Sequence, residues 1–99
     1  MKLFTLTRKA KDDLKNIANY TFKVWGIDQR DHYLKELNNA FTLLAEKPEL
    51  ARPCDHIRTG YRQFLHGSHI IFFHQPGHHG IRIVRILHKS MDIATHLPN

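Results

Sequence analysis

Residues 80–92 constrain the fold more than any other stretch, because apolar side chains stand there on consecutive positions together with two arginines. Side chains alternate between the two faces of a strand, so a strand with one wet face has an apolar residue only at every second position. Arg82 and Arg85 are three residues apart and are therefore expected on opposite faces. The same alternation groups Ile81, Ile83 and Leu87 on one face, and Val84, Ile86 and His88 on the other. Both faces of this strand need cover.

The first half of the chain predicts a strand followed by two helices. Residues 3–7 alternate as a short strand does, and Thr7 can cap a helix that ends at Gly26. Asp28 can cap a second helix that ends at Pro48. Only two residues separate the helices, so they should fold back as a hairpin that shares its apolar faces. The apolar stripes are Ala10, Leu14, Ile17, Ala18, Thr21, Val24 and Trp25 in the first helix, and Tyr33, Leu34, Leu37, Ala40, Phe41 and Leu44 in the second.

The second half predicts a linker and then three strands joined by short, turn-rich segments. The linker covers residues 48–55, and the strands cover residues 57–65, 68–75 and 80–88. We therefore expect a single domain over residues 1–99. Its class is α+β, in the order β-α-α-β-β-β, with the helical hairpin packed on one face of a mainly antiparallel sheet.

One face of the expected sheet is left without cover. The run Ile70-Ile71-Phe72-Phe73 is apolar in succession, so this strand too is apolar on both faces. A single helical hairpin covers only one face. The other face would be an apolar patch ringed by arginines, which is typical of a binding site. The alternative is that the C-terminal tail and long arginine stems cover the patch.

The charge distribution points to an acidic partner. The chain carries 15 Lys and Arg against nine Asp and Glu, a net charge of +6, and its pI is about 9.8. Residues 50–99 hold six cations against two acids, and five of those six cations are arginines. Arginine suits forked contacts to phosphate and carboxylate. We therefore expect the basic second half to be a contact surface for nucleic acid or protein.

Several functional classes find no support in the sequence. No apolar run is long enough to span a membrane, the start lacks the apolar segment of a signal peptide, and one cysteine cannot form an internal disulfide. We expect a cytoplasmic protein, with Cys54 as an apolar filler. The nearest groupings of metal-ligand types are His74 with His78 and His79, and Cys54 with Asp55 and His56. Neither has a recognised ligand spacing, so we expect no metal, no cofactor and no small-molecule substrate.

A metal-free ribonuclease is the remaining enzyme candidate. It needs a general base, a general acid and cations around the phosphate. Four arginines can supply the cations: Arg58, Arg62, Arg82 and Arg85. His88 can move a proton, but no second proton-transfer group stands beside it. No tyrosine follows Tyr61, and the nearest carboxylate, Asp92, lies in the tail.

An ordered set of short motifs runs through nearly the whole chain. In the second half they are Arg58-x-Gly60-Tyr61-Arg62, Gly67-Ser68-His69-Ile70-Ile71-Phe72-Phe73, Ile83-Val84-Arg85-Ile86-Leu87-His88 and Met91-Asp92. In the first half they are Leu6-Thr7, Ala10, Asp13-Leu14, Ile17, Tyr20-Thr21 and Trp25-Gly26. Together they resemble the ParE branch of the RelE/ParE toxins of bacterial type II toxin-antitoxin modules. The resemblance implies the fold expected above and a toxin that poisons DNA gyrase by stabilising its cleaved-DNA complex.

The RelE branch instead cuts ribosome-bound messenger RNA, in many members with a tyrosine near the C-terminus. This chain has no such tyrosine, which favours the ParE branch, whereas His88 keeps a RelE-type ribonuclease as the alternative. The resemblance implies no catalytic residue in the leading interpretation.

The resemblance also implies partners and contact residues. One partner is a ParD-type antitoxin whose C-terminal segment lies over apolar surface. The other is DNA gyrase, with its A subunit as the expected contact and its bound DNA within reach. The expected target contacts are Arg58, Arg62, Arg82, Arg85, His88 and Lys89. The expected antitoxin contacts are Leu34, Leu37, Phe41 and Leu44 in a groove of the helical hairpin, with Ile70 and Phe72 on the open sheet face.

Overall fold

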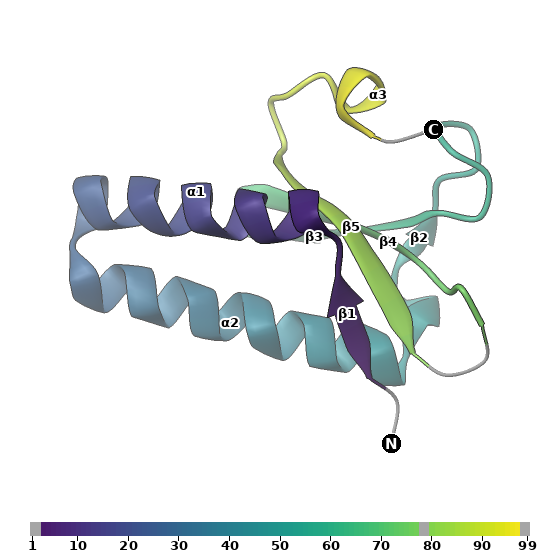
Figure 1. Cartoon of the computed structure of the whole chain (residues 1–99), viewed down its shortest axis with the longest axis horizontal. Coiled ribbons are helices and arrows are strands. Elements are labelled where there is room, and N and C mark those ends of the chain that lie inside the picture. The colour runs from purple at the N-terminus through teal and green to yellow at the C-terminus, as the bar shows by residue number, and fades with distance from the viewer. Residues whose placement is uncertain (1–2, 78–79, 98–99) are drawn as a thin grey trace.

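A computed structural model describes residues 3–77 and 80–97 (Figure 1). The elements are β1 (Phe4–Leu6), α1 (Arg8–Trp25), α2 (Ile27–Glu46), the 3-10 turn η1 (Pro48–Leu50), β2 (Arg52–Pro53), β3 (Arg62–His66), β4 (His69–His74), β5 (Ile81–His88) and α3 (Ile93–His96). The strands form one sheet in the order β1-β5-β4-β3-β2. In it β1 runs parallel to β5, and the other neighbours are antiparallel. The expected α+β fold is confirmed.

Local sequence sets the ends of the helical hairpin. The Thr7 hydroxyl accepts a hydrogen bond from the N–H of Ala10 at 3.1 Å and caps α1 as expected. Gly26, at φ +92°, ends α1 and also stands directly before α2. The expectation that Asp28 caps α2 is therefore wrong. Its carboxylate lies in the first turn, where a negative charge interacts favourably with the helix dipole.

The hairpin covers one face of the sheet and builds the larger core. Figure 1 shows the two helices side by side, with their connected ends projecting beyond the sheet. The buried residues of this core are Ala10, Ile17, Leu37, Ala40, Phe41, Leu44, Ala45, Ala51, Ile71, Phe73, Ile81, Ile83 and Ile86. The apolar stripes of both helices thus meet the sheet, as the spacing predicted, except at the projecting end.

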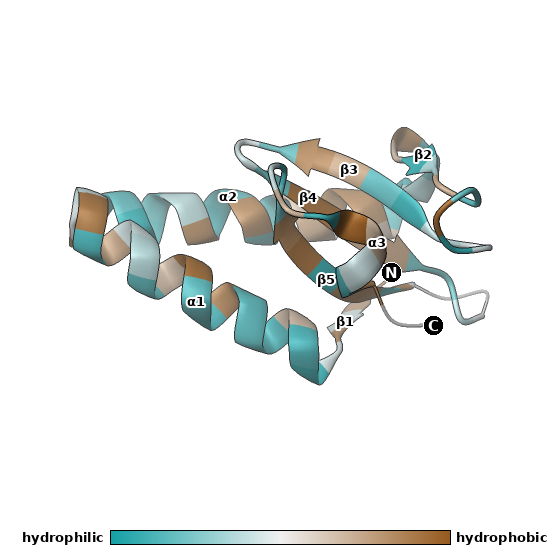
Figure 2. Ribbon diagram, turned by 90° about the horizontal axis from the view of Figure 1, so that it is seen from above, coloured by the Kyte–Doolittle hydropathy of each residue, from teal (hydrophilic) through white to brown (hydrophobic). Residues whose placement is uncertain are grey.

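The chain itself covers the other face, which corrects the expectation of an open apolar face. Five buried residues form a second core there: Cys54, Phe72, Val84, Leu87 and Leu97. Ile93 of α3 and Ile57 and Tyr61 of the irregular segment 54–61 pack against it. Figure 2 shows α3 lying over β4 and β5. The expected strand over residues 57–65 begins only at Arg62, because the N–H of Cys54 donates to the carbonyl of Tyr61 and closes a turn-rich loop.

A β-bulge in β5 breaks the alternation on which the face assignment rested. Phe73 pairs with Ile83, but Phe72 pairs with Arg85, so Val84 is an extra residue in β5. The buried residues facing the helices are Ile81, Ile83 and Ile86, and those facing α3 are Val84 and Leu87. The grouping predicted from a strict period of two holds through Val84 and is wrong beyond it. Arg85 pairs with Phe72 of the second core and therefore shares a face with Arg82, so the expectation that the two arginines lie on opposite faces is wrong as well.

Candidate functional site

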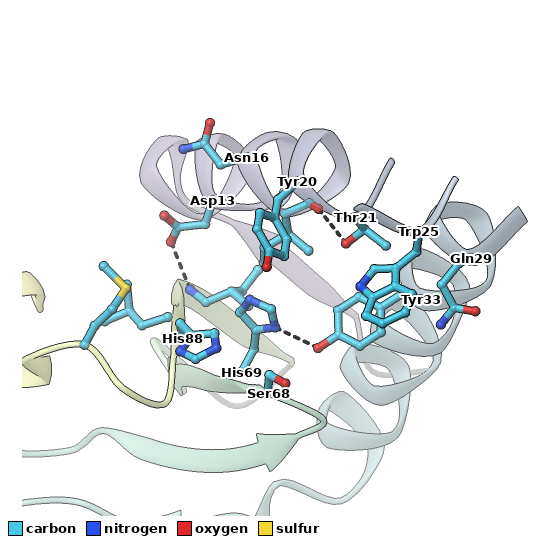
Figure 3. Close-up of a pocket in the computed structure, with 14 residues that line it drawn as sticks. Asp13, Asn16, Tyr20, Thr21, Trp25, Gln29, Tyr33, Ser68, His69 and His88 are labelled. Atoms are coloured by element: carbon cyan, nitrogen blue, oxygen red, sulfur yellow. Dashed lines mark hydrogen bonds between the residues drawn. The ribbon is translucent and has the colours of Figure 1, made fainter. Parts of the chain in front are cut away.

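A hollow of about 730 Å³ lies where α1 and the start of α2 pass the ends of β4 and β5. Its lining residues are Asp13, Asn16, Ile17, Tyr20, Thr21, Trp25, Gln29, Tyr33, Ser68, His69, Ile86, Leu87, His88 and Met91. In Figure 3 the aromatic side chains of Tyr20, Trp25 and Tyr33 come from the helices, while His69 and His88 come from the sheet. We call this hollow the hairpin pocket. It combines an aromatic wall with a polar one.

Three histidines cross the sheet in register at this end. His66 of β3 is opposite His69 of β4, which is opposite His88 of β5. Directly opposite residues share a face of an antiparallel sheet, so the three imidazoles form a row, which we call the histidine row. The rings of His69 and His88 meet edge to face, with centroids 5.5 Å apart. Tyr33 lies beside the row, with its ring centroid 5.8 Å from that of His66 and 5.7 Å from that of His69.

Hydrogen bonds hold Nδ1 of both His69 and His88. The Tyr33 hydroxyl donates to the carbonyl of His66 at 3.3 Å, and its oxygen lies 2.7 Å from Nδ1 of His69. Tyr33 thus occupies Nδ1 of His69, and Nε2 is the ring nitrogen left for another partner. The N–H of Ser90 donates to Nδ1 of His88 at 3.1 Å, so neutral His88 carries its hydrogen on Nε2.

The surroundings keep His69 neutral near pH 7. Burial lowers the pKa of His69, and the neighbouring His88 and His66 lower it further, against the opposite effect of Asp13. Burial also raises the pKa of the Tyr33 hydroxyl. These two groups therefore act as hydrogen-bonding groups rather than as fixed charges.

An ion pair between α1 and β5 borders the pocket. Nε and Nη2 of Arg85 donate to the two carboxylate oxygens of Asp13 at 2.8 and 2.9 Å, and Nη1 donates to the carbonyl of His96 at 2.8 Å. The N–H of Ile86 donates to the same carboxylate at 3.0 Å. Asp13 thus accepts a backbone N–H of β5 at a position beyond the end of β1, where β1 offers no partner. The hydrogen bonds that Arg85 donates to Asp13 raise the pKa of Arg85.

Comparison with known proteins gives the family. Residues 4–93 match the family model of the ParE toxin of the type II toxin-antitoxin system, parDE. The chain belongs to the ParE toxin family. Toxin ParE1 of Mycobacterium tuberculosis (strain CDC 1551 / Oshkosh) is 39% identical over 94 residues, which cover 95% of this chain and 96% of that protein. Toxin ParE1 of Caulobacter vibrioides is 38% identical over 99 residues, covering 98% and 99%.

A solved structure supports the same ParE-type fold. The structure described as the chromosomal ParDE TA system from P. aeruginosa matches with a TM-score of 0.75. The match covers 89% of this chain and 96% of that one. At 22% sequence identity, it is evidence of a shared fold.

The structure does not bring the six expected target contacts of this ParE toxin together. Three arginines are bonded internally: Arg58 to the carbonyls of Ile57 and Leu97, Arg62 to that of Ala51, and Arg85 to Asp13 and His96. Arg82, His88 and Lys89 are exposed. Arg82 stands opposite His74 near the start of β5, whereas His88 ends β5 at the hairpin pocket.

The expected antitoxin contacts are mostly core residues. Leu37 and Leu44 are fully buried and Phe41 is 2% exposed, because these side chains pack on the sheet. Phe72 is buried in the second core, and Ile70 packs against that core. The open surface expected at Leu37, Phe41, Leu44 and Phe72 is therefore wrong, whereas Leu34 and Ile70 are half-buried. A smaller hollow of about 330 Å³ does lie between the helices, lined by Phe4, Leu6, Leu14, Lys15, Ala18, Leu34, Asn38 and Phe41.

Sequence reasoning missed the apolar side chains at the projecting end of the hairpin. Tyr20 and Trp25 are 65% and 69% exposed, and Phe22, Val24 and Ile27 are exposed as well. The helical spacing assigned Val24 and Trp25 to the core, but the helices run past the sheet there (Figure 1). The histidine row was also missed, because strand register is not visible in a single sequence. Its one sequence signal is the spacing of His66 and His69 about a two-residue turn.

No metal centre is built from the described parts of the chain. Across residues 3–77 and 80–97, no three His, Cys, Asp or Glu side chains are placed to hold an ion together. His78 and His79 lie outside the described residues. Cys54 is fully buried, and burial raises the pKa of its thiol, which suits an apolar filler. None of the described helices is long and apolar enough to cross a membrane.

Proposed function

We propose that this ParE-family toxin acts in the cytoplasm by binding DNA gyrase and stabilising its cleaved-DNA complex, and that a ParD-type antitoxin neutralises it. The observation that carries the proposal is the family match over residues 4–93. Relatives that cover almost the whole chain are named Toxin ParE1, and the P. aeruginosa structure was solved as a ParDE system. The gyrase target itself follows from the resemblance to the ParE branch.

The internal hydrogen bonds of the arginines support a binding mode rather than a catalytic one. A ribonuclease needs cations free to stabilise the phosphate in the transition state. The guanidinium of Arg85 is instead held by Asp13, and that of Arg62 by the carbonyl of Ala51. Arg82 and Lys89 are the exposed members of the expected set, together with His88. We assign the target contact to Arg82 and Lys89.

The surroundings of Arg82 suit a nucleic acid or a protein surface at the target. The ring of Tyr61 stacks on that of His74, with centroids 5.3 Å apart and planes 16° apart, and His74 is the cross-strand neighbour of Arg82. Burial and the charge of Arg82 lower the pKa of His74. An aromatic stack beside an exposed cation offers stacking and a phosphate contact in one place.

A gyrase assay with purified proteins tests the proposal. The wild-type protein should inhibit supercoiling and raise the amount of cleaved plasmid. The Arg82→Ala/Lys89→Ala double variant should need about tenfold more protein for the same effect, since removing contact charges weakens binding. The matched control is Lys9→Ala/Lys11→Ala, which removes two exposed charges from α1. A wild-type protein that neither inhibits supercoiling nor raises cleavage would refute the gyrase target.

One observation favours the ribonuclease alternative. His69 lies beside His88, which supplies the second proton-transfer group that the sequence did not reveal. This alternative predicts that transcripts are cut within codons in arrested cells, and that His88→Ala abolishes both cutting and growth arrest. Growth arrest with intact transcripts would exclude it.

Antitoxin neutralisation is tested with the isolated pair. Adding the ParD-type antitoxin of the same module should raise the thermal unfolding midpoint of the toxin and restore gyrase supercoiling, because a ligand of the folded state stabilises it. An unchanged midpoint together with unrelieved inhibition would contradict this part of the proposal.

A further inference from the structure

The hairpin pocket joins an aromatic wall to groups that can donate hydrogen bonds to an acid. Tyr20 and Trp25, largely exposed on α1, stand on one side, and His69 and His88 stand on the other (Figure 3). An apolar wall of this kind binds apolar side chains of a partner. The few polar groups in such a pocket determine which polar or charged group the partner must also carry. The polar groups therefore identify the ligand chemistry.

The two imidazoles are prepared to bind an anion together. Neutral His88 carries its hydrogen on Nε2, because Ser90 donates to Nδ1. Nδ1 of His69 is occupied by Tyr33, whose hydroxyl can donate or accept, so a protonated His69 keeps that bond and presents the N–H of Nε2. With that proton in place, two imidazoles 5.5 Å apart each offer an N–H to one carboxylate.

The charged neighbours of His69 leave room for a further carboxylate. On α1, Asp13 has both oxygens bonded to Arg85 of β5, and one also accepts from the N–H of Ile86. On α2, Glu36 is paired with His32, and its second oxygen lies 3.8 Å from Nε2 of His66 on β3. Tyr33 of α2 and His88 of β5 complete the titratable groups around the ring. Both nearby acids thus already have cationic or donor partners.

We infer that the hairpin pocket binds an Asp or Glu carboxylate from an apolar-flanked segment of the antitoxin, held between His69 and His88, and that the complex takes up a proton as it forms. The net charge of +6 supports an acidic partner. The exposed aromatic wall supports a segment whose acid stands among apolar residues. The identity of the partner rests on the proposed function, whereas the carboxylate site rests on the pocket alone.

The first experiment measures the affinity of the purified toxin for the antitoxin at several pH values, by the fluorescence of Trp25, the one tryptophan of the chain. The dissociation constant should fall as pH falls from about 8 to about 5.5, by up to about tenfold per pH unit for one proton taken up. The His69→Asn/His88→Asn variant keeps a polar atom near each Nδ1 position but cannot be protonated. It should bind with little pH dependence.

The matched control is His56→Asn, an exposed histidine of the segment 54–61 outside the pocket, which should retain the full pH dependence. An equal pH dependence in the wild type and in His69→Asn/His88→Asn would overturn the inference. Circular dichroism melting of each variant separates loss of the site from loss of the fold.

The second experiment tests the site without the antitoxin. Phenylpropionate should quench Trp25 more strongly at about pH 5.5 than at about pH 8, whereas the neutral isostere phenylpropionamide should show no such difference. If the antitoxin fails to bind at any pH, its part of the proposed function fails and this probe alone decides on the site. Absence of phenylpropionate binding, or equal behaviour of acid and amide, would overturn the carboxylate site.

Discussion

Asp13 and Arg85 show how one pair of side chains can hold three elements. The pair joins α1 to β5, and Arg85 also donates to the carbonyl of His96 at the end of α3. The two side chains are 11% and 14% exposed, so removing one leaves a mostly buried charge without its partner. Asp13→Ala should therefore lower the free energy of unfolding by about 2–4 kcal/mol in urea denaturation.

The control for Asp13 is its exposed neighbour Asp12, where Asp12→Ala should cost less than about 0.5 kcal/mol. Arg85→Ala should likewise lower the free energy of unfolding, whereas the folded variant should still bind the target. A fully stable Arg85→Ala protein that no longer inhibits gyrase would show that Arg85 is a target contact after all.

His69 makes the stability of the free toxin depend on pH. Its pKa in the folded chain lies below the ordinary value of 6.5, so the unfolded chain binds more protons around that pH. Stability should therefore fall as pH falls through 6.5 toward the folded pKa. Thermal unfolding midpoints between about pH 8 and about pH 5 test this. His69→Asn should reduce the slope, and His74, whose pKa is also lowered, should account for part of what remains.

At the scale of elements, Gly80 sets how β5 enters the sheet. Its φ is +88°, and a Cβ there would lie 2.1 Å from the carbonyl oxygen of Leu3, which accepts the N–H of Ile81. Gly80→Ala should therefore disrupt the pairing of β1 with β5 and lower the free energy of unfolding by about 3 kcal/mol or more. Gly77→Ala is the matched control, because a Cβ at Gly77 meets nothing within 4 Å. Equal stability of the two variants would contradict this account.

The elements also show what a single sequence can and cannot predict. Thr7 and Gly26 mark the ends of α1 correctly, because capping is local chemistry. The bulge at Val84 was not predicted, since it depends on how β4 and β5 pair rather than on the composition of either strand. The histidine row depends on that pairing, and the Asp13–Arg85 pair depends on how α1 packs beside β5. Sequence reasoning therefore described Arg85 as a contact and missed His69.

The whole molecule is a sheet between two cores of its own. The chain closes the second core with α3 and the segment 54–61, so Leu97, at 4% exposed, packs with Phe72 and Val84. Leu97→Ala should cost about 2–3 kcal/mol and increase binding of an apolar dye. The same substitution at Leu65, which is 60% exposed, should change stability by less than about 0.5 kcal/mol.

At this scale the sequence predicted the order of elements and the helix-covered face but not the cover of the other face. Apolar residues on both sides of β4 and β5 correctly required two covers. The four residues Ile93–His96 are too few to predict a helix from their pattern, so the leading prediction gave the second cover to a partner. The C-terminal tail, given as the alternative, is part of the cover that the structure shows. The exposed apolar surface lies instead on the projecting hairpin, where Trp25 is 69% exposed.

The pairing of β1 with β5 also affects how the toxin is made. Thr7 donates to the carbonyl of Val84, 77 positions later, and β1 has no other strand beside it among the described residues. During synthesis on the ribosome, β1 therefore has no strand to pair with until β5 has emerged. Contacts so distant along the chain slow folding. We expect nascent toxin to remain inactive until β5 has emerged and can pair with β1.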